Sequence, residues 1–140
     1  MVVVDASLAV KWIVTEDYTV EARALEHSWE HESVRIVAPH LLPMEVANVL
    51  HKKVVRGEFV LDVATQLMRN FLATGVELVH EPVLHTRAIE LASQFGQGAV
   101  YDSHYLALAE LPNCELWTAD ERFHRATSRM FPKVRWIGSI

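Results

Sequence analysis

The stretch Met1-Val2-Val3-Val4-Asp5 is a run of apolar, mostly β-branched residues that ends at a carboxylate. A short continuous apolar run of this kind is typical of a strand buried on both faces of a parallel sheet. Four later stretches have the same character, and we predict strands over residues 34–38 (ending before Pro39), 76–79, 115–118 and 134–137. Ligands of parallel sheets bind at the carboxyl ends of the strands, so the position of Asp5 favours a functional role.

The segments between the predicted strands have helical periodicity. Helices are expected over residues 18–32, 43–56, 58–74, 82–95, 100–111 and 120–130, and several of them stop at Gly or Pro. In the first of these, the pattern predicts a buried side formed by Val20, Ala24, Leu25 and Ser28. Strands that alternate with helices indicate an α/β fold with a parallel sheet and right-handed crossovers.

The composition fits one domain that spans residues 1–140. Of its residues 51% are hydrophobic and 22% charged, which excludes a disordered or low-complexity chain. The longest unbroken apolar run, Tyr105 to Ala109, is too short to span a bilayer, and Asp5 interrupts any secretory signal. Cys114 is the only cysteine, so neither a disulfide nor a cysteine-based zinc site is expected within the chain. We therefore expect a cytoplasmic protein.

The charge of the chain is unevenly distributed. The net charge is −5, which argues against a protein that coats nucleic acid without specificity. Residues 1–32 are acidic, whereas residues 120–140 are basic, and Lys52, Lys53 and Arg56 form a second basic group. The pattern is compatible with ordinary solvated surface, or with two positive flanks beside an acidic pocket.

Four carboxylates stand at positions that the folding of a core does not require. Asp5 and Asp120 follow predicted strands, and Glu45 and Asp102 lie in the first turns of predicted helices. Taken singly, each could cap a helix or interact with its dipole. Together they point to the same edge of the sheet, where their repulsion would be costly unless a divalent cation neutralised it. An all-oxygen ligand set favours Mg²⁺ or Mn²⁺ over zinc.

The sequence resembles PIN domains, and within that superfamily the VapC-type ribonuclease toxins. The resemblance rests on the motifs Val3-Val4-Asp5-Ala6-Ser7, Pro43-Met44-Glu45-Val46-Ala47-Asn48, Val100-Tyr101-Asp102-Ser103-His104-Tyr105-Leu106-Ala107-Leu108-Ala109 and Trp117-Thr118-Ala119-Asp120. Their acids are spaced by 40, 57 and 18 residues. The resemblance implies a three-layer α/β/α sandwich with a five-stranded parallel sheet in the order 3-2-1-4-5.

The same resemblance implies a metal-dependent endoribonuclease. Asp5 and Asp102 would be the principal metal ligands, and Glu45 and Asp120 would bind directly or through water. Ser7 and Thr118 are expected to orient these groups, and Asn48 lies on the same helix face as Glu45. Candidate contacts to the RNA backbone are the basic side chains Lys52, Lys53, Arg56, Arg122, His124 and Arg125. Relatives of this kind form homodimers and are silenced by a VapB-like antitoxin, so we expect both partners here.

Two other functions are compatible with the sequence. A PIN-like module could bind RNA or protein without cleaving it, although such a module would be expected to lose acids. A metal-dependent phosphohydrolase could act on small molecules instead of RNA. The stretch His27-Ser28-Trp29-Glu30-His31 formally matches a zinc-peptidase pattern, but it lies on an acidic amphipathic helix and is a poor candidate. His104 is expected to be a polar residue at the rim of the site.

Overall fold

A computed structural model describes all residues, 1–140, as one five-stranded parallel sheet with helices packed on it. The strand order is β3-β2-β1-β4-β5, as predicted, and every neighbouring pair is parallel. The strands are β1 (Val2–Val4), β2 (Ile36–Pro39), β3 (Glu77–Val79), β4 (Glu115–Thr118) and β5 (Val134–Trp136). The α/β fold class inferred from the sequence is therefore confirmed.

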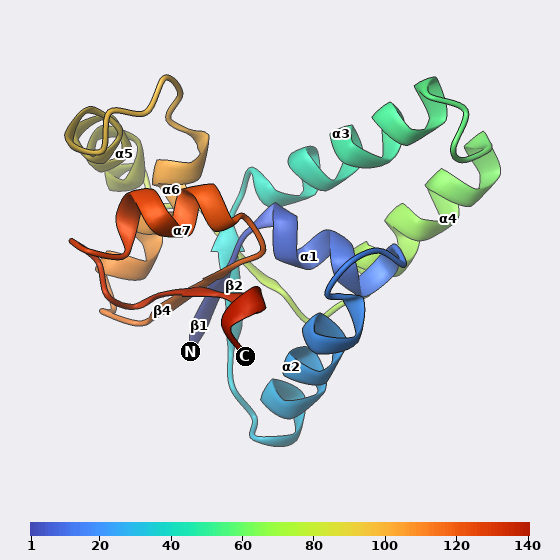
Figure 1. The fold of residues 1–140 in the computed structure, drawn as a ribbon, viewed down its shortest axis with the longest axis horizontal. Coiled ribbons are helices and arrows are strands. Elements are labelled where there is room, and N and C mark those ends of the chain that lie inside the picture. The colour runs from blue at the N-terminus through green and yellow to red at the C-terminus, as the bar shows by residue number, and fades with distance from the viewer.

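Seven α-helices and a terminal 3₁₀ turn connect and cover the strands (Figure 1). They are α1 (Ala6–Ile13), α2 (Thr19–His31), α3 (Leu42–Val55), α4 (Leu61–Leu72), α5 (Val83–Gln94), α6 (Tyr101–Glu110), α7 (Glu121–Thr127) and η1 (Ile137–Ser139). Helix α6 packs on β1, β2 and β4, whereas α1 contacts β4 together with α2, α3 and α4. Helices α3 and α4 form an arm that projects away from the sheet, and α5, α6 and α7 lie on the other side of the molecule (Figure 1).

The core is built around the first strand and the helix that covers it. Val3 and Val4 are fully buried, as are Leu8 and Val46 from the adjoining helices. Every residue of the run Tyr105–Ala109 is buried, so α6 is enclosed on nearly all sides. Burying an aliphatic side chain of this size contributes about 1.5–3 kcal/mol before entropy is counted, so these residues hold the strand ends firmly in place.

The topology brings the ends of two strands together at the centre of the sheet. β1 lies between β2 and β4, and the chain winds outward from it in both directions. Val4 is in register with Trp117, and the amide of Asp5 donates to the carbonyl of Trp117 at 3.2 Å. The residues that follow β1 and β4 therefore meet at the switch point of the sheet, where α/β proteins bind ligands.

Three details of the sequence-based prediction were wrong. No helix was predicted over Ala6–Ile13, an eight-residue helix that is mostly apolar and buried and whose only polar side chains are Ser7 and Lys11. Strand β2 includes Pro39, which pairs with Val79 at the end of the ladder instead of terminating it. In α2, Val20 is 79% exposed, and the buried residues are Thr19, Ala22 and Trp29.

Candidate active site

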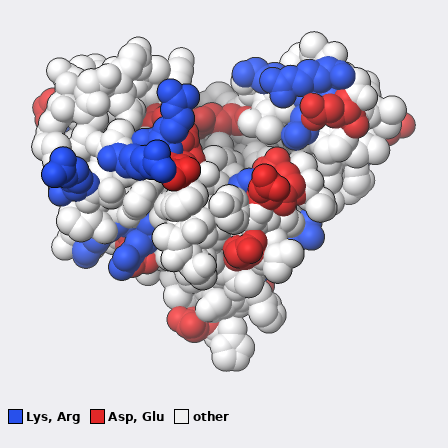
Figure 2. All heavy atoms as spheres, viewed as in Figure 1, with Lys and Arg blue, Asp and Glu red and all other residues white.

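A cleft of about 540 Å³ opens at the carboxyl ends of β1 and β4. It contains all four predicted acids, Asp5, Glu45, Asp102 and Asp120. The other lining residues are Ala6, Ser7, Val10, Lys11, Glu16, Asn48, Val49, Lys52, Lys53, Arg56, Tyr105 and Ala119. In the space-filling view, a notch separates two lobes, with acidic atoms in the notch and basic side chains on both lobes (Figure 2).

Asp5 is the most deeply buried of the four acids and is only 6% exposed. Its Oδ1 accepts a hydrogen bond from the hydroxyl of Ser7 at 2.6 Å and another from the amide of Leu8 at 3.0 Å, so it also caps α1. No Lys or Arg forms an ion pair with it. Burial raises the pKa of this carboxyl to about 6. The hydrogen bonds from Ser7 and Leu8, and a third from the Thr118 hydroxyl, lower the pKa but do not cancel the effect of burial.

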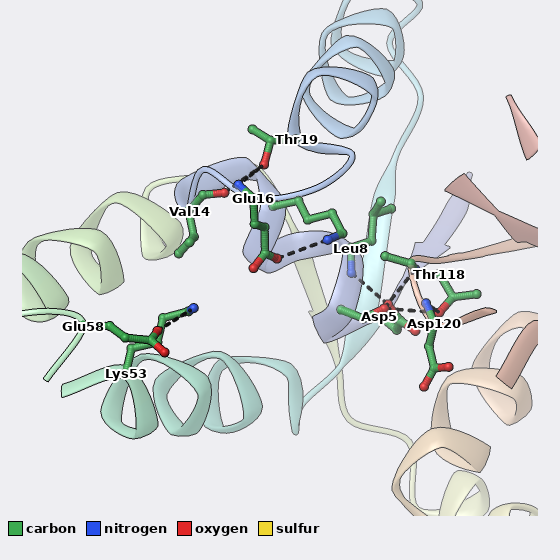
Figure 3. Close-up of polar contacts among 12 residues, drawn as sticks. Asp5, Leu8, Val14, Glu16, Thr19, Lys53, Glu58, Thr118 and Asp120 are labelled. Carbon is green, nitrogen blue, oxygen red and sulfur yellow. Dashed lines mark hydrogen bonds and ion pairs between the residues drawn. The ribbon is translucent and has the colours of Figure 1, made fainter. Parts of the chain in front are cut away.

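The hydroxyls of Ser7 and Thr118 join the end of β1 to the end of β4. Figure 3 shows Thr118 beside Asp5 and Asp120. The two hydroxyls lie 3.2 Å apart, and Ser7 donates its own proton to Asp5. Ser7 Oγ accepts from the amide of Ala119, and Thr118 Oγ1 accepts from the amide of Asp120, each at 2.9 Å. Thr118 is fully buried behind the cleft, where its hydroxyl helps to hold Asp5 and the backbone of Asp120.

Glu45 is held by a tyrosine that the sequence analysis did not select. The hydroxyl of Tyr105 donates to Glu45 Oε1 at 2.7 Å, from α6 to α3. Burial raises the pKa of Glu45, as does the charge of Asp102, and the Tyr105 hydrogen bond partly offsets this. Tyr105 lies one helical turn after Asp102, and this i,i+3 spacing was the available signal.

Asp102 and Asp120 face one another across the same cleft. Burial, followed by the charge of Asp120, raises the pKa of Asp102. Oδ1 of Asp120 accepts from the amides of Arg122 at 2.9 Å and Phe123 at 3.1 Å, so this carboxylate caps α7. Its Oδ2 makes no hydrogen bond within the chain and is free for a ligand.

The four acids suit a hydrated hard cation better than a fully dehydrated one. None of them has a basic partner, and the pKa values of Asp5, Glu45 and Asp102 are all raised. No three His, Cys, Asp or Glu side chains of the structure form a group that could hold a metal ion. The acids thus share a cleft without forming a closed ligand shell, and Mg²⁺, which keeps several waters, matches such an open set of oxygens.

The predicted RNA contacts fall into two groups. Lys52, Lys53 and Arg56 line the cleft along α3, and Lys53 pairs with Glu58 at 3.2 Å. The three basic candidates of α7 do not line the cleft; they are Arg122, Arg125 (paired with Glu121) and His124 (stacked on Trp136). The first group borders the acids, and the second flanks the cleft on the other lobe (Figures 1 and 2).

Lys11 and Glu16 are cleft residues that sequence reasoning missed. The side chain of Lys11 is 11% exposed, and its Nζ lies 3.2 Å from Glu16 Oε1. The backbone of Glu16 is fixed by a hydrogen bond from its amide to Thr19 Oγ1 at 2.9 Å (Figure 3). Lys11 was missed because no helix was predicted here; its i,i+4 spacing from Ser7 was the available signal. It places a positive charge inside the acidic cleft, neutralised by a carboxylate that is not one of the four.

The zinc-peptidase pattern of α2 receives no support from the structure. His27, Glu30 and His31 lie exposed along α2 and form no group able to hold a metal. None of the helices has both the length and the apolar character needed to cross a bilayer.

Comparisons with known proteins agree with the fold. A family model described as PIN domain matches residues 2–128. Ribonuclease VapC9 of Mycobacterium tuberculosis is 29% identical over 122 residues, covering 87% of each chain. The crystal structure of PAE2754 from Pyrobaculum aerophilum superposes with a TM-score of 0.69 at 20% identity, over 99% of this chain and 90% of its own. The crystal structure of VapC20 of M. tuberculosis, described as a sarcin–ricin loop cleaving toxin, superposes with a TM-score of 0.70 at 17% identity. The match covers 96% of this chain and 99% of VapC20. The chain is a member of the PIN domain family.

Proposed function

We propose that this protein is a Mg²⁺- or Mn²⁺-dependent endoribonuclease and the toxin of a type II toxin–antitoxin pair. The observation that carries the proposal is the convergence of Asp5, Glu45, Asp102 and Asp120 on one cleft without any basic partner. The likeness to a protein named ribonuclease VapC9 supports RNA as the substrate. We further propose that residues 1–140 act as a single PIN domain in the cytoplasm.

Within this proposal, Asp5 and Asp102 hold the cation directly, and Glu45 and Asp120 bind it directly or through water. A divalent cation in such a site lowers the pKa of bound water and neutralises charge on the phosphoryl oxygens. The raised pKa values imply that the acids bind the cation best above about pH 6, where Asp5 is ionised.

The remaining cleft residues position groups and hold substrate. Ser7 and Tyr105 fix the orientation of Asp5 and Glu45, so neither carboxylate has to be ordered when the cation binds. Lys52 and Arg56 form no ion pairs and are free to contact the phosphates of a bound RNA strand. Asn48 lies between these residues and Glu45 on α3 and can donate to a phosphate or sugar oxygen.

The proposal includes two protein partners. A VapB-like antitoxin would cover the cleft and silence the enzyme, and two copies of this chain would form a homodimer. The likeness to a protein named ribonuclease VapC9 supports the antitoxin partner, and the homodimer is proposed from the family resemblance. Co-expression with the product of the adjacent reading frame, followed by size-exclusion chromatography with light scattering, tests both.

The deciding experiment is cleavage of total RNA with mapping of the new ends, wild type beside Asp5→Asn. We expect cleavage by the wild type with Mg²⁺ or Mn²⁺, none with a chelator, and none by Asp5→Asn. The exposed Asp62, in the first turn of α4, supplies the matched control Asp62→Asn, which should cleave normally. RNA binding without cleavage would indicate a binding module. Activity on p-nitrophenyl phosphate with indifference to RNA would indicate a small-molecule phosphohydrolase.

A further inference from the structure

Four of the eight histidines gather around a second cavity, outside the acidic cleft. This cavity of about 330 Å³ lies between the end of β2, the end of β3 and the first turns of α5 and α6. The rings form a chain in which His40 lies 5.6 Å from His80, His80 lies 6.2 Å from His85, and His85 lies 5.1 Å from His104, centroid to centroid. The four residues are far apart in the sequence, so only the fold brings them together.

The closest pair, His85 and His104, directs two ring nitrogens at one another. His85 Nδ1 and His104 Nε2 are 2.9 Å apart. His104 Nδ1 lies 2.8 Å from the carbonyl oxygen of Val100, an acceptor only, so Nδ1 carries the proton. In the neutral ring, Nε2 therefore presents its lone pair toward His85. A histidine whose second nitrogen donates to a backbone carbonyl is the usual arrangement of a metal ligand.

We propose that His85 and His104, with His80 as a third ligand, form a site for a borderline transition-metal dication, Zn²⁺ in the first place. Zinc–imidazole bonds of about 2.0–2.1 Å at a tetrahedral angle put two ligating nitrogens about 3.3 Å apart and their ring centroids about 5 Å apart. The observed 2.9 Å and 5.1 Å are close to both values. The ion takes the place of the proton that His85 Nδ1 donates to His104, and that proton moves to Nε2 of His85, whose ring stays neutral.

The third ligand comes from the end of β3. No three side chains of the structure are already at metal-binding distance, so the pair is preformed and His80 completes the site by turning its side chain. His80 is exposed, and its ring is in edge contact with His85, so this rotation meets no packed core. Glu81 lines the same cavity and supplies a nearby negative charge.

Ligand chemistry separates this site from the acidic cleft. Imidazole nitrogens select zinc, copper and nickel, whereas carboxylate oxygens suit magnesium and manganese. The site joins α5 to the first turn of α6, which also carries Asp102. A bound ion would thus cross-link α5 and α6 at the edge of the cleft. The inference does not depend on the proposed nuclease activity.

Binding of Zn²⁺ to the full chain, measured by isothermal titration calorimetry in excess Mg²⁺, tests the site. We expect one equivalent to bind and to raise the melting temperature. His85→Ala and His80→Ala should each weaken binding about tenfold or more, with melting temperatures unchanged when zinc is absent. His51→Ala removes an exposed histidine of α3 and should leave zinc binding intact. Co²⁺ should give the visible spectrum of a tetrahedral nitrogen site in the wild type and in His51→Ala, but not in His85→Ala or His80→Ala.

Two further variants separate this site from the other places where zinc could bind. The double variant His27→Ala/His31→Ala removes the paired histidines of α2, and Asp5→Asn weakens the acidic cleft. Both should keep wild-type zinc affinity. The proposal is overturned if the wild type does not bind zinc, or if His85→Ala or His80→Ala binds it as tightly as the wild type. It is also overturned if zinc binding is lost in His27→Ala/His31→Ala or in Asp5→Asn.

Discussion

The hydroxyl of Tyr105 donates a 2.7 Å hydrogen bond to Oε1 of Glu45, and this single contact joins α6 to α3 across the acidic cleft. Tyr105 is only 1% exposed, whereas Glu45 reaches the cleft. The same helix α6 carries Asp102 one turn earlier. The hydrogen bond therefore sets the position of Glu45 relative to Asp102, two acids from different walls of the cleft.

Replacing Tyr105 by Phe removes this hydrogen bond and keeps the ring in the core. We expect the free energy of unfolding to fall by about 1–2 kcal/mol, because Glu45 loses its donor. We also expect a higher Mn²⁺ concentration for half-maximal RNA cleavage. Tyr101→Phe is the matched control, since Tyr101 is 62% exposed and makes no hydrogen bond to the acids. Wild-type metal dependence in Tyr105→Phe would contradict a positioning role.

Asp5→Asn should stabilise the metal-free protein near neutral pH. Burial raises the pKa of Asp5 from 3.8 to about 6, so between these values the folded state holds a proton that the unfolded state has lost. Stability therefore falls as the pH rises through this window, by at most about 3 kcal/mol for this group. Asn cannot ionise, and its oxygen can still accept from Ser7 and Leu8.

Urea unfolding from pH 4 to pH 8 in a chelating buffer measures this effect. The variant should be the more stable protein at pH 7, and the gap should close toward pH 4. Asp62→Asn, at an exposed position of α4, should show no such gap. Parallel stability curves for Asp5→Asn and the wild type would show that Asp5 is not desolvated as the structure indicates.

Divalent cations should reverse this loss of stability in the wild type. By the proposed function, millimolar Mn²⁺ or Mg²⁺ should bind the ionised acids of the folded state only, and it should therefore raise the melting temperature at pH 7.5 more than at pH 5. Asp102→Asn should reduce the shift. Differential scanning fluorimetry measures it, and a melting temperature that Mn²⁺ does not move at pH 7.5 would count against the metal site.

Two variants of Asp120 should distinguish its structural role from its chemical role. Its Oδ1 caps α7, so Asp120→Ala should cost about 1 kcal/mol of stability, whereas Asp120→Asn should keep most of the cap. Both variants lose the charge, and both should therefore lose cleavage activity. Thermal unfolding and the RNA assay, run on the same samples, distinguish the two effects. Full activity in Asp120→Asn would show that its charge is not needed.

The basic residues of α3 should differ in their contribution to RNA binding. Lys52→Ala and Arg56→Ala should each weaken binding and reduce the slope of log affinity against log salt by about 0.7–0.9, the release expected for one phosphate contact. Lys53→Ala should have a smaller effect, because its ammonium is paired with Glu58. Fluorescence anisotropy of labelled RNA, measured in the inactive Asp5→Asn background, gives these slopes. Equal slopes for all three variants would argue against a defined RNA path along α3.

The sequence predicted the five strands well but missed the first helix. All five strands were predicted to within two residues at each end, because short β-branched runs bounded by polar residues leave few alternatives. Helix α1 was missed because it has only eight residues, and its two polar side chains, Ser7 and Lys11, were not recognised as one face of a helix. The N-cap at Asp5 was the available signal for it.

The sequence by itself determined the α/β class, the strand order through its family resemblance, and the four acids that line the cleft. Only the tertiary structure decided that Tyr105 holds Glu45, that Lys11 enters the cleft, and that Arg122 and Arg125 stay outside it. It also brought His85 against His104. Local patterns record which face of a segment is buried, whereas contacts between distant segments depend on crossover geometry and side-chain direction, which no local pattern encodes.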